Sequence, residues 1–542
     1  MSKEVFTRKA TGLTRPFGVI DTLIIAVGAI NLGSGTLLVY STSLAFAPGY
    51  NYVLSLFVAM VLNLFVVLAY SQITIAMPRS GGDYVFVSRT INPALGFANN
   101  FFWTVMSILG IAWNCLFMAG TAVSTSLTVG GAALSSSYMT SLGQAATQPV
   151  WGFVIGVVTM LAIMILMIVD VKWLKMVNLI TFVIGMITVI AWVVILGTTP
   201  LSSFITSFNT FAKPYTNSTN SYQMIIQSAQ SNGMSIAVNW NAIFGATLLT
   251  LPISYFTLGG ANIVNFFSGE IKEVGRSAVW STLGALVSIF VFDTLIGVAL
   301  FSATGYNFMT ALSYLASNVP SAYALPVQPF LPLIVDIAAP NIGIVMLTLV
   351  GMISWLYLLA MSYYLIATRN TFAWSFDGVI PTWFSEVNAK YHTPIRSVLT
   401  ITILAVFGIA FYQLIFPLAF SYSNFTTGYN TAWLVACASA AAFPFIKKDT
   451  FEAQPTYVKK RIAGIPTMTI FGILGALSVI AMDVMVALNP SYAGIPANLS
   501  NISLVILGLI FVIGLVFFWA AKAIQKSRGL DLSLVFKEIP PS

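Results

Sequence analysis

The stretch Ala26-Val27-Gly28-Ala29-Ile30-Asn31-Leu32-Gly33-Ser34-Gly35-Thr36 places three glycines inside an apolar run near the N-terminus. A second run, Tyr255-Phe256-Thr257-Leu258-Gly259-Gly260-Ala261-Asn262, places two adjacent glycines inside another. Glycine is a poor helix former, so each run predicts a break in a helix that crosses a membrane. Broken backbone is tolerated in a bilayer where it lines a cavity or is buried in protein. Paired breaks in two halves of a chain indicate the substrate site of a secondary transporter.

The composition of the chain is that of a membrane protein. Of its 542 residues, 58% are hydrophobic and only 7% are charged, whereas a soluble domain carries roughly 25% charged residues. A span needs about 20 apolar residues. We therefore predict an all-α membrane protein with about twelve transmembrane helices. The apolar runs place them near 17–46, 50–76, 95–127, 149–170, 174–199, 239–268, 277–301, 341–368, 397–418, 425–446, 463–488 and 502–524.

The basic residues predict the orientation of these spans. If the spans alternate from an N-terminus inside the cell, 22 of the 23 Lys and Arg residues fall on the inner side. Only Lys213 falls on the outer side. This bias follows the positive-inside rule and predicts cytoplasmic termini in the plasma membrane. The bias also accounts for the net charge of +8, so a nucleic-acid partner is not expected. Membrane lipid is expected to surround the spans.

The two breaks fall in the first and sixth spans, so the repeated unit has five spans. Because five is odd, the second copy enters the membrane from the opposite side, which is the inverted repeat of many secondary transporters. Helices 11 and 12 fall outside the two repeats. The predicted division is a cytoplasmic tail at 1–16, a first repeat at 17–200, an extracellular loop at 201–238, a second repeat at 239–446, helices 11 and 12 with their preceding loop at 447–524, and a cytoplasmic tail at 525–542.

A break exposes backbone groups that can bind a ligand. The free N–H groups at the start of a half-helix carry partial positive charge and suit a carboxylate. The free carbonyl groups at the end of the preceding half-helix suit an ammonium group or a cation. Gly33-Ser34-Gly35 would let the backbone approach a ligand closely, and Ser34 adds a hydroxyl. The alternative is that these glycines serve close helix packing; a second break five spans later favours the binding site.

Five stretches resemble the amino acid–polyamine–organocation (APC) superfamily of permeases, in the correct order between about residues 17 and 446. One departure is Val274-Gly275, where the family usually has a proline. The stretches are Asp21 with Gly28-Ala29, Ile30-Asn31-Leu32-Gly33-Ser34-Gly35, Met77-Pro78-Arg79-Ser80-Gly81-Gly82-Asp83-Tyr84, Gly269-Glu270-Ile271-Lys272-Glu273 with Arg276, and Arg369 with Asp377-Gly378-Val379-Ile380-Pro381 and Thr393-Pro394.

The resemblance implies a five-plus-five fold and transport of amino acids or related amines. It implies that the Gly33-Ser34-Gly35 backbone holds the substrate carboxylate and that carbonyls of the two breaks hold the amine. It places Phe256 as an aromatic cap and Tyr363 on span 8 facing the site, although ordinary packing stays open for both rings. The substrate-binding residues expected are Ile30, Gly33, Ser34, Gly35, Phe256, Leu258, Gly259, Gly260 and Tyr363.

The coupling ion stays open between a proton and sodium. Some relatives carry a lysine on span 5, but the corresponding position here is Gly185, which disfavours a lysine-based mechanism. A sodium site would use carbonyls near Gly28 and the hydroxyls of Ser354 or Ser362. Asp293 in span 7 is a candidate proton carrier or a structural carboxyl, because a charged Asp at mid-bilayer costs roughly 2.5–3.5 kcal/mol. Asp483 in span 11 lies outside the repeats, and this location favours a structural role for its carboxyl group.

Other classes of protein fit less well. An enzyme is not expected, because the only histidine is His392 and the sequence holds no cluster for metal binding or nucleophilic catalysis. No Walker-type loop is present in the sequence, so ATP and other cofactors are not expected. A channel, or a receptor that binds a small amine, is the alternative. The predicted pocket offers few charges, which favours a neutral or apolar amino acid as the substrate.

Overall fold

The computed structural model describes residues 15–388, 390–391, 393–415, 421–488 and 500–537. His392 and most of the predicted N-terminal tail lie outside the described residues. Within them, eleven helices are long and apolar enough to cross a membrane. The span predicted at 425–446 corresponds to helix α19, whose segment Thr431–Ile446 is a shorter apolar helix. The all-α architecture predicted from the apolar runs is therefore present.

The first half of the chain supplies spans 1 to 5, and spans 1 and 3 are each assembled from several helical pieces. Span 1 comprises α1 Val19–Ile30, α2 Leu32–Leu37, the π-helix η1 Leu38–Thr42 and α3 Ser43–Phe46. Span 2 is α4 Tyr52–Ala76, and the short helix α5 Asp83–Thr90 follows it. Span 3 comprises α6 Pro93–Phe117, the π-helix η2 Met118–Val123 and α7 Ser124–Ala133, with α8 Ser137–Ala146 after it. Spans 4 and 5 are α9 Pro149–Ile168 and α10 Val171–Thr198.

The second half repeats this order with a different connection. Span 6 is α13 Trp240–Thr257 with the 3₁₀ segment η3 Ala261–Glu270, span 7 is α14 Val274–Thr304, span 8 is α17 Ile342–Phe376, span 9 is α18 Ile395–Ala410 with η6 Phe411–Ile415, and span 10 is α19 Ser421–Ile446. The connecting elements are α11 Leu201–Thr216 and α12 Ser221–Ser231 before span 6, α15 Tyr306–Asn318, η4 Pro320–Ala322 and α16 Leu331–Ala338 between spans 7 and 8, and η5 Thr382–Ser385 between spans 8 and 9. The remaining elements are α20 Lys448–Glu452, β1 Arg461–Ile462, β2 Ile465–Pro466, α21 Thr467–Leu488, α22 Ser500–Ser527 and α23 Leu532–Val535.

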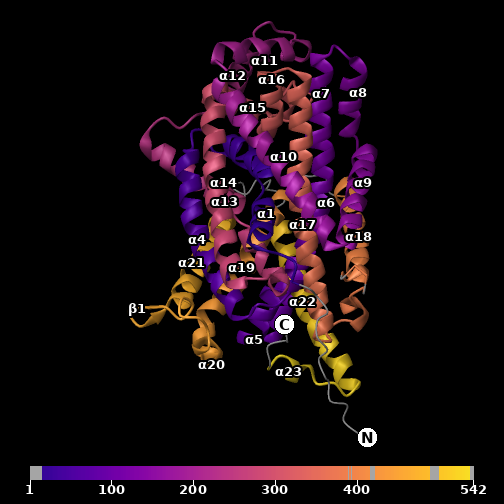
Figure 1. Ribbon diagram of the computed structural model, residues 1–542. Coiled ribbons are helices and arrows are strands. Elements are labelled where there is room, and N and C mark those ends of the chain that lie inside the picture. Colours follow the sequence, from indigo (N-terminus) through magenta and orange to yellow (C-terminus); the bar gives the residue numbers. More distant parts are fainter. Residues whose placement is uncertain (1–14, 389, 392, 416–420, 489–499, 538–542) are drawn as a thin grey trace.

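Helices five spans apart pack against one another. The end of α1 contacts η3, α4 contacts α14, α6 contacts α17, and α9 contacts α18. This is the arrangement expected of two repeats that face each other, and it brings both helix breaks to the middle of the bundle. In Figure 1, α1 lies at the centre, among α10, α14 and α17. The fold therefore places the two glycine-containing runs side by side.

One end of the bundle carries extra helices, and the other carries α20 and α23 (Figure 1). Helices α11, α12, α15 and α16 lie at the upper end as drawn. The segment 201–238, predicted only as a loop, thus forms two helices. Phe204, Phe208 and Ala212 recur every four residues on α11 and are fully buried, which is the amphipathic pattern of a helix that packs on its neighbours. At the lower end, β1 and β2 form a hairpin whose loop residues, Ala463 and Gly464, both have positive φ, as a type I′ turn requires.

Candidate functional site

The break in span 1 is made by Asn31. Helix α1 ends at Ile30, Asn31 adopts φ 72°, and α2 begins at Leu32. Asparagine tolerates this region better than most residues. Its Oδ1 accepts hydrogen bonds from the Ser34 backbone N–H at 2.8 Å and from the Ser34 hydroxyl at 3.0 Å. Its Nδ2 donates to the carbonyl of Trp355 on α17 at 2.5 Å. The side chain of Asn31 therefore caps the second half-helix and ties the break to span 8.

The glycines that follow Asn31 lie inside α2 and not at the break itself. A Cβ added to Gly33 would lie 2.7 Å from Cβ of Trp355, and one added to Gly35 would lie 2.9 Å from Cγ2 of Thr257. Real Cβ contacts are longer than this, so any larger residue would push the half-helix away from α17 or α13. Close helix packing, considered above as an alternative, is thus one role that the structure gives both glycines.

The break in span 6 depends on a glycine, Gly260, whose backbone adopts a conformation that other residues rarely adopt. Helix α13 ends at Thr257, and Gly260 adopts φ 106° before η3 begins. A Cβ added to Gly260 would lie 3.2 Å from the carbonyl oxygen of Ala29. Only glycine adopts this backbone conformation without strain. The two breaks are therefore in direct contact, with Gly260 set against the last turn of α1.

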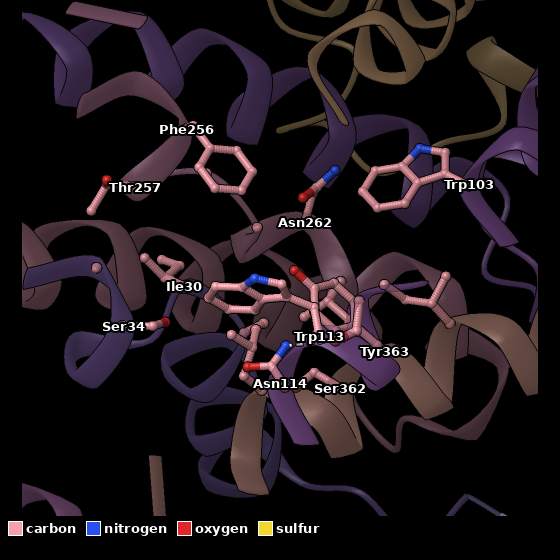
Figure 2. Close-up of a pocket in the computed structure, with 18 of the residues that line it drawn as sticks. Ile30, Ser34, Trp103, Trp113, Asn114, Phe256, Thr257, Asn262, Ser362 and Tyr363 are labelled. Carbon is pink, nitrogen blue, oxygen red and sulfur yellow. Dashed lines mark hydrogen bonds between the residues drawn. The ribbon is translucent and has the colours of Figure 1, made fainter. Parts of the chain in front are cut away.

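A cavity of about 70 Å³ lies where the breaks meet. Its walls come from spans 1, 3, 6, 8 and 10, and Figure 2 shows many of its side chains. Among the described residues that line it, none is charged. The lining residues are Ala29, Ile30, Ser34, Gly35, Leu38, Trp103, Gly110, Trp113, Asn114, Phe256, Thr257, Gly259, Gly260, Asn262, Ile263, Phe266, Leu359, Ser362, Tyr363, Ile366 and Trp433.

The cavity is mostly apolar, with a few polar groups whose hydrogen bonds are largely local. The amide of Asn114 donates to the Gly110 carbonyl at 2.8 Å, while its buried Oδ1 accepts no hydrogen bond within the described part of the chain. The Thr257 hydroxyl donates to the Ile253 carbonyl at 2.9 Å. An uncharged cavity with a few placed polar groups is typical of a small-molecule site. Asn114 Oδ1 is the acceptor that such a ligand would satisfy.

Most of the residues expected at the site come together around this cavity. Gly33 and Leu258 do not line it: Gly33 packs on Trp355, and Leu258 is fully buried at the end of α13. Those that line it are Ile30, Ser34, Gly35, Phe256, Gly259, Gly260 and Tyr363.

The sequence placed span 3 at the pocket together with spans 1, 6 and 8, but it predicted no lining residue on span 3 and did not predict a contribution from span 10. Trp103, Trp113 and Asn114 on α6 and Trp433 on α19 line the cavity. A Cβ at Gly110 would lie 2.8 Å from the Tyr363 ring, so this glycine makes room for that aromatic side chain. A mid-span Gly110 next to two tryptophans on the same helix was the available signal, but no quoted stretch included it.

The chain matches a model of the amino acid permease family over residues 21–533. The chain belongs to the amino acid permease family. No match was found among curated proteins. The resemblance read from the five stretches is confirmed, and so is the all-α membrane fold. The permease is a multi-pass membrane protein, and its family is one of amino acid transporters rather than enzymes.

The residues considered for ion coupling in the permease lie in different places. Ser362 lines the cavity, and its hydroxyl donates to the Leu358 carbonyl at 2.8 Å. Ser354 similarly donates to the Val350 carbonyl. Gly28 is packed tightly, since an added Cβ would lie 2.9 Å from Cβ of Leu358. Asp293 is fully buried on α14.

The position at which some relatives have a lysine is filled from the other repeat. The indole of Trp355 donates to the Gly185 carbonyl at 3.2 Å, and a Cβ at Gly185 would lie 2.9 Å from that ring. Trp355 thus occupies the space between Gly33 on span 1 and Gly185 on span 5. A long side chain at position 185 would have to displace a fully buried tryptophan.

Below the cavity, two buried ion pairs join segments that are far apart in sequence. Arg369 on α17 makes two hydrogen bonds of 2.8 Å to Glu270 at the end of η3. Arg89 on α5 lies 2.5 Å from Asp377 at the end of α17. All four side chains are at most 5% exposed. Glu270, Arg369 and Asp377 belong to the family-like stretches, so these stretches meet at the two ion pairs, a region called the lower closure from here on.

Asp83 lies in the same lower region, on α5 and outside the spans. It accepts a hydrogen bond of 2.9 Å from the Tyr70 hydroxyl. Burial raises the pKa of Asp83 to about 7, because the charged form loses its hydration. The α5 segment is also held by its neighbours, since Gly81 N–H donates to the Phe266 carbonyl at 2.9 Å. The closure therefore contacts Phe266, a residue of the cavity wall.

Proposed function

We propose that the permease is a secondary active transporter that moves neutral amino acids with compact or apolar side chains by alternating access. The observation that carries the proposal is the uncharged cavity bounded by both helix breaks. The lower end, which carries α20, α23 and the β1–β2 hairpin, is assigned to the cytoplasm of a plasma-membrane protein, because the basic residues of the sequence concentrate on this side. A channel or a receptor for a small amine is the alternative.

The absence of charge in the cavity favours a neutral side chain on the substrate. A lysine, arginine or glutamate side chain would bury a charge without a partner among the described lining residues. Such a charge costs several kcal/mol, on the order of the effective penalty for an unpaired buried ion. The volume of about 70 Å³ corresponds to roughly five to seven water-sized groups at 10–15 Å³ each. This size favours an amino acid with a short side chain.

The backbone of the two breaks suits the charged ends of an amino acid. We assign the carboxylate to the start of the half-helix that contains Ser34 and Gly35, where the helix dipole is positive. Because the Ser34 N–H donates to Asn31 Oδ1 in the structure, a hydrogen bond from this N–H to the carboxylate requires the substrate to displace the cap. The ammonium group is assigned to carbonyls at the ends of α1 and α13, near Ile30 and the Gly259-Gly260 pair, with Asn114 Oδ1 as a further acceptor. Phe256 and Tyr363 enclose the side chain.

Alternating access requires the lower closure to open. The pair Arg369–Glu270 joins the half-helix η3 of span 6 to span 8, so a path from the cavity to the lower end requires the two side chains to separate. Gly33 and Leu258 act in this scheme as packing residues that hold the breaks against their neighbours.

The test is uptake by the purified permease in liposomes, with a panel of radiolabelled amino acids. The proposal predicts saturable uptake of small neutral amino acids, with counterflow when the liposomes are preloaded. Flux that never saturates would indicate a channel, and binding without uptake would indicate a receptor. Better uptake of arginine, lysine or glutamate than of alanine would contradict the assigned substrate class. Liposomes without protein and the variant Gly260→Val serve as controls for leak.

A further inference from the structure

Asp293 places a buried carboxyl group in the middle of span 7. Its side chain is 0% exposed. Neither carboxylate oxygen has a hydrogen-bond partner among the residues that the structure describes. An isolated charged carboxylate in such a place is costly, and intramembrane acids of this kind usually mark ion or proton pathways. The local geometry therefore suits the neutral, protonated form of Asp293.

Asp293 lies directly behind the cavity wall. A Cβ built on Gly35 would lie 3.9 Å from Oδ2 of Asp293 and 2.9 Å from Cγ2 of Thr257. Gly35 and Thr257 both line the cavity. The carboxyl group is therefore separated from the substrate space by a single layer, made of the residues beside the two helix breaks.

The other titratable groups near Asp293 are tyrosines. The Tyr40 hydroxyl donates to the Asp293 backbone carbonyl, the Tyr50 hydroxyl donates to the Val39 carbonyl at 2.5 Å, and Tyr52 packs against Tyr40. The hydroxyl groups of Thr257 and Tyr40 thus donate their hydrogen bonds to backbone carbonyl oxygens and not to the Asp293 carboxylate. A hard cation needs several converging oxygen ligands, whereas a proton needs only the carboxylate.

The charged residues of the elements packed on α14 lie away from Asp293, toward the ends of the helices. On α1, Asp21 pairs with Lys175 of α10 at 2.8 Å, and Asp21 lies in the first turn of α1, at the end opposite the helix break. The others are Lys172 on α10, Glu270 on η3, Lys213 on α11 and Arg276 at the start of α14 itself.

We propose that Asp293 carries one proton across the membrane with each substrate molecule, so that the permease is a proton symporter. The inference rests on the proposed amino acid site. The substrate carboxylate assigned to the half-helix of Ser34 and Gly35 would lie next to an ionised Asp293, and like charges at this range repel. Protonation of Asp293 removes the repulsion. Proton binding and substrate binding therefore favour each other, and by linkage the effect is reciprocal.

The first experiment measures alanine uptake into liposomes with an imposed inward proton gradient. The wild-type permease should accumulate alanine, and a pH-sensitive dye trapped inside should record one proton for each alanine. Asp293→Asn, which resembles the protonated group, should keep alanine counterflow but lose accumulation driven by the gradient. Asp483→Asn is the matched control, because Asp483 is also an intramembrane acid and accepts a hydrogen bond from Thr431 at 3.2 Å; it should keep gradient-driven accumulation.

The second experiment measures alanine binding as a function of pH in detergent. On the alkaline side, the wild-type affinity should fall by about tenfold per pH unit, as expected when one proton must bind with the ligand. The affinity of Asp293→Asn should not change over the same range. The wild-type profile and the dye measurement need no variant, so they test the inference even if Asp293→Asn fails to fold.

Three results would overturn the inference. They are alanine accumulation by Asp293→Asn under a proton gradient, wild-type accumulation that follows a sodium gradient and ignores protons, and alanine entry without proton entry. Each would leave the amino acid site intact. In contrast, the absence of saturable uptake of any amino acid by the wild type would contradict the proposed function itself.

Discussion

The two helix breaks lie in contact at the centre of the permease, but they are built in different ways. In span 1 the chain turns at Asn31, and the side chain of that residue supplies hydrogen bonds to both the following half-helix and span 8. In span 6 it turns at Gly260, which has no side chain and lies against the Ala29 carbonyl. The first break is held by hydrogen bonds, and the second is held by close packing and by a backbone conformation that only glycine adopts easily.

We infer from this difference that the two breaks have different roles during transport. A break whose lost backbone bonds are replaced by one side chain keeps its geometry, so the span 1 break behaves as a fixed point attached to α17. The span 6 break lacks such a side chain, and the residues after it form η3, which ends at the Arg369–Glu270 pair. We therefore expect motion to centre on the span 6 break.

Gly260→Val should produce the largest loss of uptake. Valine at φ 106° is strained by roughly 1–3 kcal/mol, and its Cβ would lie 3.2 Å from the Ala29 carbonyl oxygen. Together these effects should lower alanine uptake by about a hundredfold, the equivalent of close to 3 kcal/mol. Gly245→Val is the matched control on α13, because an added Cβ there meets no atom within 4 Å. Equal uptake by the two variants would mean that the approach of the two breaks is unimportant.

Asn31→Ala should be the next most damaging change. It removes the cap on Ser34 N–H and the hydrogen bond to Trp355, each worth about 1 kcal/mol, and places alanine at positive φ. We expect alanine uptake to fall by about tenfold to a hundredfold. Asn31→Gly restores backbone freedom without the cap, so recovery by this variant would show that the turn, not the side chain, is what the site needs.

A control for Asn31 is available at another helix start. Asn92 caps α6 by accepting from the N–H groups of Ala94 and Leu95, far from the cavity lining. Asn92→Ala should lower the midpoint of thermal unfolding, through a cost of about 1 kcal/mol, while leaving the KM for alanine unchanged. A rise in KM as large as that of Asn31→Ala would mean that any loss of a cap has the same effect.

The contrast between the breaks also explains what the sequence could reveal. Glycine runs in two apolar segments predicted both breaks, and the length of the apolar runs predicted the all-α fold, because both signals are local in sequence. The exact turning residue in span 1 was not predicted, because Asn31 acts through Trp355, which is 324 positions away. For the same reason, the sequence did not predict the tryptophans of span 3 that line the cavity, nor the contribution of span 10. A tryptophan in the middle of a span is interpreted as an ordinary packing residue until its neighbours in space are known.

Phe256→Ala tests the cavity wall next to the span 6 break. Phe256 lines the cavity, and its removal should raise the KM for alanine by about tenfold through lost enclosure, or roughly 1.4 kcal/mol. Phe244→Ala is the control on the same helix, because Phe244 is 46% exposed on the outer face of α13. Equal KM values for the two variants would mean that Phe256 is an ordinary packing residue and does not enclose the substrate.

Ser34→Ala should have the smallest effect, and it separates two accounts of the span 1 break. The Ser34 hydroxyl donates to Asn31 Oδ1, which also accepts from the Ser34 backbone N–H. If the hydroxyl keeps this bond during transport, its loss leaves Oδ1 satisfied and costs about 0.5–1 kcal/mol, or a two- to fivefold rise in KM. If the hydroxyl turns to the substrate carboxylate, a charge-assisted bond of about 1.5–3 kcal/mol is lost and the KM rises more than about tenfold. A small rise would thus indicate that the rigid break binds through its backbone alone, and a large rise would indicate that its cap opens when the substrate arrives.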